Sequence, residues 1–376
     1  MNILVALSYY YPNISGLSIY AKTLSEELVK VGYKVTVLTS RHKPGFKHIS
    51  QENGVRVKRL WTPFIFGRGP LMPTYPFEVV EEVLKSDIVN IHIPQFEGFF
   101  LALIAKIFHK KVVLTHHCDL SGWPGFLNRI SEGAADISLL LMGKLADSIV
   151  VYTKDYADNS HYLKRFKNKL VYLLPPVKFP NSSEKRRGLG GNMKYKIGFA
   201  GRIAREKGIS FLISATPYVE KEIGRNFKIC IAGPGKEVIG GGIEKELSKL
   251  IKKHKNYLSF LGPLDQKHMA MFYNSIDVLV LPSTERLESF GFVQVEAMLS
   301  GCPVVASNLP GVRVPVKLTK MGEVVPVGNS EKIAESIVKV LKNRKKYVKA
   351  KHQIRQIFNW SDTIIRYEKI FKNLSL

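Results

Sequence analysis

Cysteine is scarce in this sequence, and long apolar runs are missing. The 376 residues include three cysteines, Cys118, Cys230 and Cys302, too few and too widely spaced for a disulfide framework or a zinc site. This usage favours a reducing, cytoplasmic setting. No apolar run reaches the roughly 18 residues that a membrane-spanning helix needs. The start of the chain lacks the basic segment of a signal peptide, so we expect neither a membrane span nor a secretory leader.

Acidic side chains are also under-represented. Asp and Glu total 31 against 56 Lys and Arg, which gives a formal net charge of +25. Such an excess implies anionic partners: nucleic acid, an acidic membrane surface or phosphorylated small molecules. The chain shows no helix-turn-helix pattern, zinc spacing or RNP-like aromatic strand, and its bases form no single stripe. We expect no nucleic-acid partner, and a basic nucleic-acid-binding protein stays as the alternative from another class.

The order of apolar runs and helical patterns indicates two consecutive α/β halves. Strand-like runs begin at residue 2 and recur at 34–40, 55–61, 87–93, 111–117 and 147–153. A segment rich in Pro, Gly, Ser and charge near 173–190 interrupts the alternation, which restarts at 196–201, 227–233, 257–262, 277–283 and 303–307. Because these runs are continuously apolar, each half is expected to form a doubly wound, Rossmann-like parallel sheet covered on both faces.

These patterns set the expected domain boundaries. We place an N-terminal domain at residues 1–175 and a C-terminal domain at residues 176–358. Residues 359–376 have the pattern of an amphipathic helix, and we assign them to the N-terminal domain, onto which the chain would cross back.

The strand-to-helix turns carry the candidate site, because ligands of open α/β sheets bind beyond the carboxyl ends of the strands. Gly16 lies in the first such turn, and Gly233 follows a strand of the second half. Gly201 and Arg202 follow another strand, and Lys207 lies near the start of the next helix, where free N–H groups add to the positive charge that an anion meets. A complete dinucleotide fingerprint and a Walker A lysine motif are both missing.

The stretch 281–307 is the most informative part of the chain. Glu288 lies in a turn after a strand, and Glu296 lies eight residues further on, inside the following helix. Phe290 and Gly291 begin that helix, so their N–H groups can meet a phosphate or a hydroxyl-rich ligand. Two carboxylates near Arg202 would be odd for anion binding alone. They indicate a ligand that carries both phosphates and hydroxyls.

The two glutamates, separated by seven residues with Phe-Gly between them, resemble the signature of retaining GT-B glycosyltransferases, specifically glycosyltransferase family 4. Other pieces occur in the family's order: YYPNISG, THH before Cys118, GRIAREKG, IAGPG, FLGPL and a late Trp360. The resemblance covers nearly the whole chain. It implies the GT-B fold, in which two Rossmann-like domains face each other across a cleft.

The resemblance also implies a role for each matching residue on the donor side. Arg202 and Lys207 match the pair that binds the donor diphosphate, Glu296 the acid that binds the nucleotide ribose, and Glu288 the acid that faces the transferred sugar. The remaining donor-binding residues implied are Gly16, Gly201, Gly233, Ser289, Phe290 and Gly291. The sequence departs from the family pattern at Ser15, where a first glycine is usual, at Val314, where many relatives have an acid, and in the linker LPPV.

On the other side of the reaction the resemblance implies a histidine near the reacting carbon. His117 is the match and is grouped with Glu288, Arg202 and Lys207 as catalytic. His116 competes with it, because strand alternation lets only one of the two face the cleft. His116 and Asp119 are the acceptor-side candidates.

The expected activity is metal-independent transfer of a sugar, without a cofactor, from a UDP- or GDP-sugar to a hydroxyl acceptor with retention of configuration. A saccharide or lipid-linked acceptor and an anionic membrane surface are the expected partners, with the enzyme peripheral at the inner face of the membrane. The aromatic loop at 61–77 is interpreted as functional, whereas the apolar stretch at 99–111 is interpreted as a core helix. A nucleotide-sugar epimerase and a glycogen-synthase-like enzyme are the alternatives within the same fold.

Overall fold

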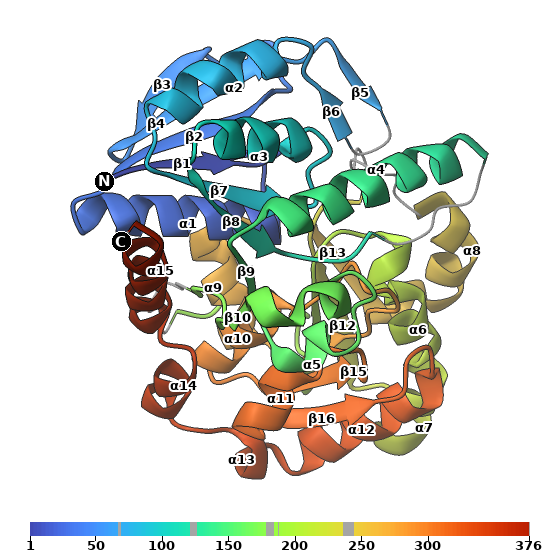
Figure 1. Cartoon of the computed structure of the whole chain (residues 1–376). Helices are drawn as coiled ribbons and strands as arrows, with labels where there is room; N and C mark the ends of the chain where they lie inside the picture. The colour runs from blue at the N-terminus through green and yellow to red at the C-terminus, as the bar shows by residue number, and fades with distance from the viewer. Residues whose placement is uncertain (67–68, 121–125, 178–183, 187, 236–243, 376) are drawn as a thin grey trace. The chain divides into compact units, whose positions relative to one another are not determined.

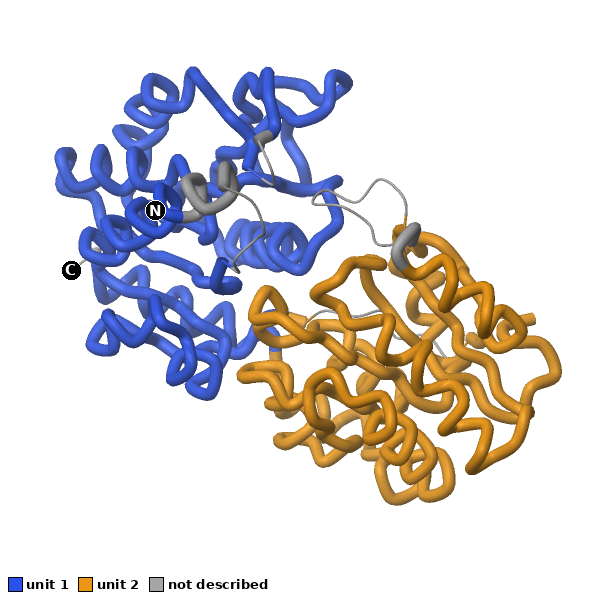
Figure 2. The backbone as a smooth tube through the Cα atoms, turned by 90° about the vertical axis from the view of Figure 1, so that its right-hand side faces the viewer, with its two compact units in different colours: residues 1–176, 360–376 blue, residues 177–359 orange. Residues whose placement is uncertain are grey.

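The computed structural model describes residues 1–66, 69–120, 126–177, 184–186, 188–235 and 244–375. The chain forms two compact units, which Figure 2 colours separately. Unit 1 comprises Met1–Pro176 with Trp360–Leu376, and unit 2 comprises Val177–Asn359. The boundaries expected from the sequence lay after residues 175 and 358. The roles expected for the two domains stay predictions.

Unit 1 contains an eight-stranded sheet in the order β10-β9-β8-β7-β1-β2-β4-β3 (Figure 1). Its strands are β1 (Asn2–Ala6), β2 (Lys34–Arg41), β3 (Ile49–Glu52), β4 (Val55–Trp61), β7 (Ile88–Ile93), β8 (Lys111–His116), β9 (Ser148–Val151) and β10 (Leu170–Tyr172). Neighbours pair in parallel except β3, which is antiparallel to β4. The sequence signal for this hairpin is Asn53-Gly54, where both residues have positive φ.

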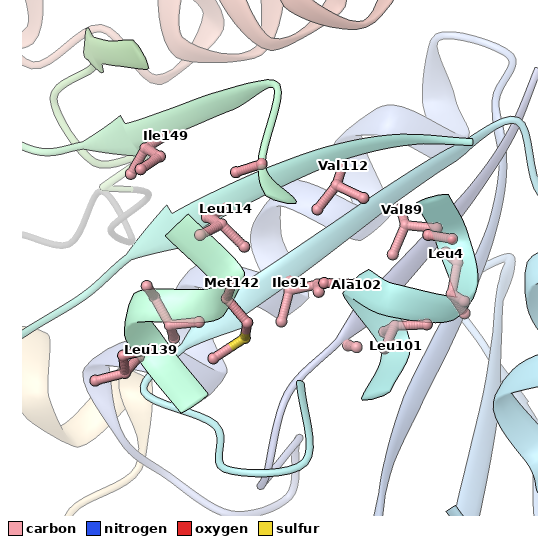
Figure 3. Close-up of a cluster of buried hydrophobic side chains, with 14 of the residues drawn as sticks. Leu4, Val89, Ile91, Leu101, Ala102, Val112, Leu114, Leu139, Met142 and Ile149 are labelled. Atoms are coloured by element: carbon pink, nitrogen blue, oxygen red, sulfur yellow. The ribbon is translucent and has the colours of Figure 1, made fainter. Parts of the chain in front are cut away.

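Helices cover both faces of this sheet. They are α1 (Gly16–Lys30), α2 (Tyr75–Leu84), α3 (Gly98–Ile107), α4 (Phe126–Leu145), α5 (Lys154–Ala157), the 3-10 helix η1 (Leu163–Lys169) and α15 (Trp360–Ser375). Leu101 of α3 and Met142 of α4 pack with Leu114 of β8 in the core on one face (Figure 3). Thr115 points to the opposite face, as strand alternation requires, and its hydroxyl lies 2.9 Å from that of Tyr367 in α15.

The C-terminal helix α15 therefore packs onto unit 1, which confirms the expected crossing. The Tyr20 hydroxyl of α1 lies 2.8 Å from the Tyr367 hydroxyl, and the Thr363 hydroxyl donates to the Leu174 carbonyl at 2.8 Å. Both contacts are made by the face of α15 that turns inward.

The segment 61–77 is not the aromatic loop that we expected. It contains two short antiparallel strands, β5 (Phe64–Phe66) and β6 (Gly69–Leu71), and α2 begins at Tyr75. Pro and Gly at 63, 67, 69 and 70 suggested a loop, but Phe64 pairs with Leu71 and Ile65 with Pro70 across the two strands. The stretch 99–111, by contrast, contributes Leu101, Ala102 and Ala105 of α3 to the core, as expected.

Unit 2 contains a six-stranded parallel sheet in the order β13-β12-β11-β14-β15-β16. The strands are β11 (Tyr195–Ala200), β12 (Phe227–Ala232), β13 (Leu258–Gly262), β14 (Val278–Leu281), β15 (Val304–Ser307) and β16 (Gly322–Val325). The order reverses beside β11, and a crevice at such a switch point is where ligands of doubly wound sheets bind.

The helices of unit 2 follow the expected alternation. They are α6 (Ile209–Ser214), α7 (Thr216–Ile223), α8 (Glu244–His254), α9 (Gln266–Ser275), α10 (Phe292–Leu299), α11 (Val314–Thr319), α12 (Ser330–Lys342), α13 (Arg344–Tyr347) and α14 (Lys351–Ile357), with 3-10 helices η2 (Arg205–Lys207) and η3 (Lys255–Tyr257). One expected helix at 210–219 is divided into α6 and α7, because Pro217 begins a new helix. In the described part of the chain no helix is both long and apolar enough to cross a bilayer.

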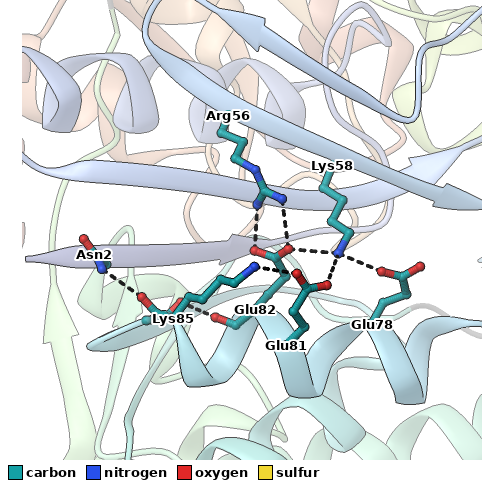
Figure 4. A network of polar contacts seen from close by, with 8 residues as sticks. Asn2, Arg56, Lys58, Glu78, Glu81, Glu82 and Lys85 are labelled. Atoms are coloured by element: carbon teal, nitrogen blue, oxygen red, sulfur yellow. Dashed lines mark hydrogen bonds and ion pairs between the residues drawn. The ribbon is translucent and has the colours of Figure 1, made fainter.

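An ion cluster around the buried side chains of Lys58 and Glu82 fixes α2 to the sheet of unit 1 (Figure 4). The ammonium of Lys58 in β4 contacts carboxylates of Glu78, Glu81 and Glu82 at 2.7, 3.0 and 2.9 Å, and the Lys58 side chain is 4% exposed. Arg56 also pairs with Glu82 at 2.7 Å. Burial alone would lower the pKa of Lys58, but the hydrogen bonds that its ammonium donates to the three carboxylates hold that pKa above its ordinary value.

Removing the Lys58 charge should therefore destabilise unit 1. We expect Lys58→Met to lower the free energy of unfolding by about 3–5 kcal/mol, because it leaves carboxylates packed together without their shared cation. The exposed pair between Lys332 and Glu335 offers the matched control, and Lys332→Met should change that free energy by less than about 1 kcal/mol. Urea unfolding of both variants measures the difference. Equal effects would contradict a stabilising role for the cluster.

Candidate functional site

Two glycine turns lie back to back at the carboxyl ends of β11 and β12. Gly201 and Gly233 both have a φ of +143°, and a Cβ added to Gly233 would lie 2.0 Å from the Gly201 carbonyl oxygen. The Gly201 N–H donates to the Ala232 carbonyl at 2.9 Å. Glycine is required at position 233 because any side chain would collide with the neighbouring turn.

The turn after β11 also docks on the end of β14. Gly208 has a φ of +63°, and a Cβ there would lie 2.0 Å from the Pro282 carbonyl oxygen. The Thr284 N–H donates to the Glu206 carbonyl at 2.9 Å. This docking brings the loop that follows β14 against the η2 turn.

The docking joins two predicted site residues that are far apart in the sequence. The ammonium of Lys207 in η2 donates a hydrogen bond to the carboxylate of Glu288, which lies in the loop after β14. Both side chains are mostly buried, 20% and 12% exposed. The guanidinium of Arg202 donates to the Glu206 carboxylate at 2.7 Å, which fixes its orientation. A cation and a carboxylate thus meet at the carboxyl edge of the sheet.

The N-terminus of α10 follows directly after Glu288. Ser289 and Phe290 are buried, and Gly291 has a φ of +79° as the residue that precedes the helix. The amide of Gln294 holds the turn by donating to the carbonyls of Phe290 and Val312 at 2.8 and 2.9 Å. The first N–H groups of such a helix have no carbonyl partner within the helix and can meet an anion.

Glu296 occupies a different environment from Glu288. It lies in α10, and its carboxylate accepts a hydrogen bond of 2.9 Å from the hydroxyl of Tyr273 in α9. Burial raises the pKa of Glu296, and the Tyr273 hydrogen bond lowers it by less. The structure therefore groups Gly201, Arg202, Lys207, Gly233 and Glu288 at one edge, with α10 linking them to Glu296.

In unit 1, Gly16 is the first residue of α1. Ser15 precedes the helix in an extended conformation, with φ −146°, so this position does not require a glycine. The Ser15 hydroxyl accepts from the Ser18 N–H at 3.1 Å, and the Ser18 hydroxyl accepts from the Ser15 N–H at 2.9 Å. This reciprocal capping explains how the chain tolerates the departure from the family's first glycine.

His117 is buried inside a chain of hydrogen bonds in unit 1. Its Nε2 lies 2.9 Å from Nδ1 of His92, and its Nδ1 contacts the Tyr152 hydroxyl. Nε2 of His92 lies 3.0 Å from Oδ1 of Asn90. The Asn90 amide nitrogen donates to the Val113 carbonyl at 3.0 Å, which fixes Oδ1 as the acceptor.

This chain of hydrogen bonds determines the tautomers of His92 and His117. Burial lowers the pKa of His92 to about 3, and the pKa of His117 also lies well below its ordinary value because of burial, so both rings are neutral. Since Asn90 accepts, His92 carries its proton on Nε2 and accepts at Nδ1. His117 must then donate from Nε2 and accept from the Tyr152 hydroxyl at Nδ1.

His116 points to the opposite face of the sheet. Its ring stacks on Tyr162 at 5.5 Å between centroids, and its Nε2 lies 3.3 Å from a carboxylate oxygen of Asp119. Nδ1 of His116 is buried without a hydrogen-bond partner among the residues described. Asp119 also accepts from the Ser160 hydroxyl at 2.7 Å. The two acceptor-side candidates are therefore neighbours, separated by the sheet from His117.

Polar side chains that the sequence did not predict as a site lie at the carboxyl ends of β1 and β7. The hydroxyl of Tyr9 and Oε1 of Gln95 are buried without hydrogen-bond partners among the described residues. Burial raises the pKa of Glu97 to about 7. Burial, and to a smaller degree the Glu97 charge, raises the pKa of Tyr9 to about 12. The available signal was position alone, since Gln95 and Glu97 directly follow a strand.

The two Rossmann-like units place the chain in the GT-B class of folds. The crystal structure of HepE from Anabaena in complex with UDP-glucose is similar, with a TM-score of 0.77 at 18% identity over 99% of this chain and 100% of that chain. The sucrose-phosphate synthase of Thermosynechococcus elongatus has a TM-score of 0.72 at 17% identity over 99% and 98%.

Sequence comparison gives the family. Residues 14–177 match the model of Glycosyltransferase Family 4, and residues 181–357 match that of Glycosyl transferases group 1. An uncharacterized glycosyltransferase of Methanocaldococcus jannaschii is 28% identical over 99% of this chain and 98% of its own length. The phosphatidyl-myo-inositol mannosyltransferase of Mycobacterium leprae is 31% identical over 45% and 44%. The chain belongs to glycosyltransferase family 4, as the resemblance implied.

The derived tautomers give a direct spectroscopic prediction. In protein labelled with ¹⁵N-histidine, two-bond ¹H–¹⁵N spectra should show His92 and His117 as neutral Nε2–H tautomers that do not titrate between about pH 5 and about pH 8. Tyr152→Phe removes the donor to Nδ1 and should shift the His117 signals. The control Tyr156→Phe, whose hydroxyl contacts the Asp119 N–H instead, should leave them unchanged. An Nδ1–H tautomer in either ring would refute the assignment.

The environment of Glu296 gives a pH-dependent prediction. Because burial raises its pKa, ionising Glu296 disfavours the folded state above the ordinary carboxyl pKa of about 4.3. Glu296→Gln should therefore raise the melting temperature of the unliganded protein at pH 8, and the gain should vanish near pH 4. The exposed Glu222→Gln is the control and should show no such difference. Equal melting curves for wild type and Glu296→Gln at pH 8 would contradict this account.

Proposed function

We propose that the protein transfers a sugar from a nucleotide-diphosphate sugar to a hydroxyl of a saccharide or lipid-linked acceptor, with retention of anomeric configuration. The observation that carries this proposal is the contact between Lys207 and Glu288 beside Arg202, at the carboxyl edge of the unit 2 sheet. It combines positive charge for phosphate with a carboxylate for sugar hydroxyls. The UDP-glucose complex of HepE supports a donor of this class.

Lys207 changes its partner in the proposed reaction. In the unliganded state its ammonium is neutralised by Glu288. A diphosphate at the glycine turns would attract Lys207, and Glu288 would then accept hydrogen bonds from the sugar. Negative charge grows on the leaving diphosphate as the bond to the anomeric carbon breaks. Lys207, Arg202 and the N–H groups of α10 therefore stabilise the transition state more than the bound donor.

Glu296 is proposed to bind the ribose hydroxyls. Its carboxylate is already oriented by the Tyr273 hydroxyl and lies beyond the first turn of α10, away from the Lys207 contact. The raised pKa of Glu296 reflects a carboxylate that is poorly solvated before a ligand arrives. Two ribose hydroxyls would supply the hydrogen bonds that water cannot.

The acceptor is proposed to bind at the carboxyl edge of the unit 1 sheet. The unpartnered Tyr9 hydroxyl and Gln95 Oε1 and the buried Glu97 carboxyl gather there, and such atoms require hydrogen bonds from a ligand or water. The name of the mycobacterial relative, a phosphatidyl-myo-inositol mannosyltransferase, supports a lipid-linked acceptor. Such an acceptor would bring the enzyme to the membrane surface.

The proton of the acceptor hydroxyl is proposed to pass to the leaving phosphate oxygen. The anomeric carbon–phosphate oxygen bond breaks while the bond to the acceptor oxygen forms on the same face, which retains the configuration. Both ring nitrogens of His117 are engaged, by His92 and Tyr152, so this ring is proposed to orient the sugar by contact and not to move a proton. The protein cations are proposed to neutralise the diphosphate, and the expected independence from metal stays a prediction.

Donor binding tests the proposal. UDP- and GDP-sugars at about 100 times Kd should stabilise the wild type by about 2.7 kcal/mol in a thermal-shift assay. Lys207→Met should abolish the shift, because it removes the phosphate partner, whereas the exposed Lys221→Met should retain it. Glu288→Gln should retain nucleotide binding but lower turnover about a hundredfold.

The turnover assay also gives the stereochemistry of the transfer and its metal requirement. NMR of the first-formed product should show the anomeric configuration of the donor, and EDTA should leave the rate unchanged. A product of inverted configuration would exclude the same-face transfer. A donor shift that survives in Lys207→Met would remove the proposed pocket.

A further inference from the structure

A hollow of about 190 Å³ lies at the amino edge of the unit 2 sheet. Lys194 and Lys196 line it from the start of β11, Asp277 from the residue before β14, and Arg344 from the start of α13. Lys185 and Arg186 complete the basic wall. The turn with Gly201 lies at the other end of β11, about 20 Å away for a strand of this length. The hollow is therefore separate from the proposed donor site.

The positive charge around this hollow exceeds the negative charge that the described lining residues supply. Within the described ranges none of these five cations has a carboxylate oxygen within ion-pair distance, and Asp277 is the single acid in the lining. The Asp277 carboxylate instead accepts the Lys196 backbone N–H at 2.8 Å. Elsewhere in the molecule the buried Lys58 has three carboxylate partners. Five cations without a counterion attract an anion.

The two guanidinium groups at the hollow differ in their hydrogen bonds to the protein. Arg344 donates from Nε to the Asp277 carbonyl at 3.4 Å and from Nη2 to the Gly301 carbonyl at 3.2 Å. Nη1 of Arg186 is buried and has no hydrogen-bond partner among the described residues. A buried guanidinium nitrogen without an acceptor is unfavourable unless a ligand supplies one.

The segment that carries Arg186 is fixed to α9. The Arg186 N–H donates to the Ser275 hydroxyl at 2.6 Å, and the Asn274 amide donates to the Glu184 carbonyl at 3.0 Å. Ser275 in turn donates to the Met271 carbonyl at 2.7 Å. The backbone of Arg186 is thus positioned before any ligand binds.

We propose that this hollow is a second anion site, which binds a phosphate or diphosphate group. Its volume lies below the roughly 300–1,000 Å³ of pockets that enclose a drug-sized ligand, so it fits the charged group alone. Arg186 and Arg344 offer the planar donors that recognise phosphate oxygens in pairs, and the lysines add charge. This site is independent of the proposed donor site.

Inorganic pyrophosphate is the probe, measured by isothermal titration of the full chain. If both sites bind it, the wild type should show two equivalents. Arg186→Gln should weaken one of them about ten- to a hundredfold, because one charge-assisted donor is lost. Arg344→Gln should weaken the same equivalent, and Lys207→Met should affect only the other. The exposed Arg355→Gln carries the same charge change and should affect neither.

These variants separate the two proposals. A single equivalent that is lost in Arg186→Gln and retained in Lys207→Met would support the second site and count against the donor site. The second site would be overturned if Arg186→Gln and Arg344→Gln left pyrophosphate binding unchanged. It would also be overturned if Arg355→Gln weakened that binding equally. If Arg344→Gln lowers the melting temperature, the result with Arg186→Gln decides, because its side-chain nitrogen has no structural partner to lose.

Two further arms identify the source of the phosphate. Sedimentation with phosphatidic acid vesicles that is lost in Arg186→Gln would support the site and assign it to a lipid headgroup. Absence of sedimentation together with pyrophosphate binding would assign it to a free phosphate. A single-stranded oligonucleotide is the third probe. If it displaces pyrophosphate, binds more tightly than pyrophosphate and shows a steep salt dependence, the proposal of a small-anion site is overturned in favour of a polyanion site.

Discussion

The candidate site depends on how closely the backbone turns approach one another at the carboxyl edge of the unit 2 sheet. Gly233 packs against the Gly201 carbonyl, and Gly208 packs against the Pro282 carbonyl, at distances that exclude any Cβ. These two contacts bring the turns after β11, β12 and β14 together. The position of Lys207 beside Glu288 follows from them, because each residue lies within a few positions of a glycine contact. The backbone turns consequently set the positions of the charged side chains of the site.

Much of this architecture could be predicted from the sequence. Continuous apolar strands and breaks at Gly and Pro gave the strands of both sheets to within one or two residues in most cases. The failures have local causes. The hairpin of β5 and β6 was taken for a loop because glycine and proline separate the apolar residues of its two strands. β3 was missed because Ile49–Glu52 is mostly polar, and the short edge strands β10 and β16 were missed as well. Pro217 divides a helix whose apolar pattern continues through it.

The site was less predictable than the fold, because contacts between distant residues have no signature in one sequence. The resemblance to the family selected Lys207 and Glu288, but nothing in the sequence shows that they contact each other across 81 positions. His117 was also selected, yet its hydrogen bonds to His92 and Tyr152 depend on β7 and the end of β9 as well as on β8. The hollow with Arg186 was not identified, because its cations come from three separate segments.

The polar groups at the centre of the unit 1 sheet differ from those at the edges of the unit 2 sheet. In unit 1 the central groups are neutral and saturated: Asn90, His92 and His117 each have defined donors and acceptors, and burial keeps both rings uncharged. In unit 2 the groups at the sheet edges keep their charge, either paired as in Lys207 and Glu288 or unpaired as in Arg186. Neutral side chains whose hydrogen bonds within the protein are all satisfied can orient a substrate without exchanging protons with it. Charged groups that are partly satisfied attract phosphate, which is why the proposed donor contacts lie in unit 2.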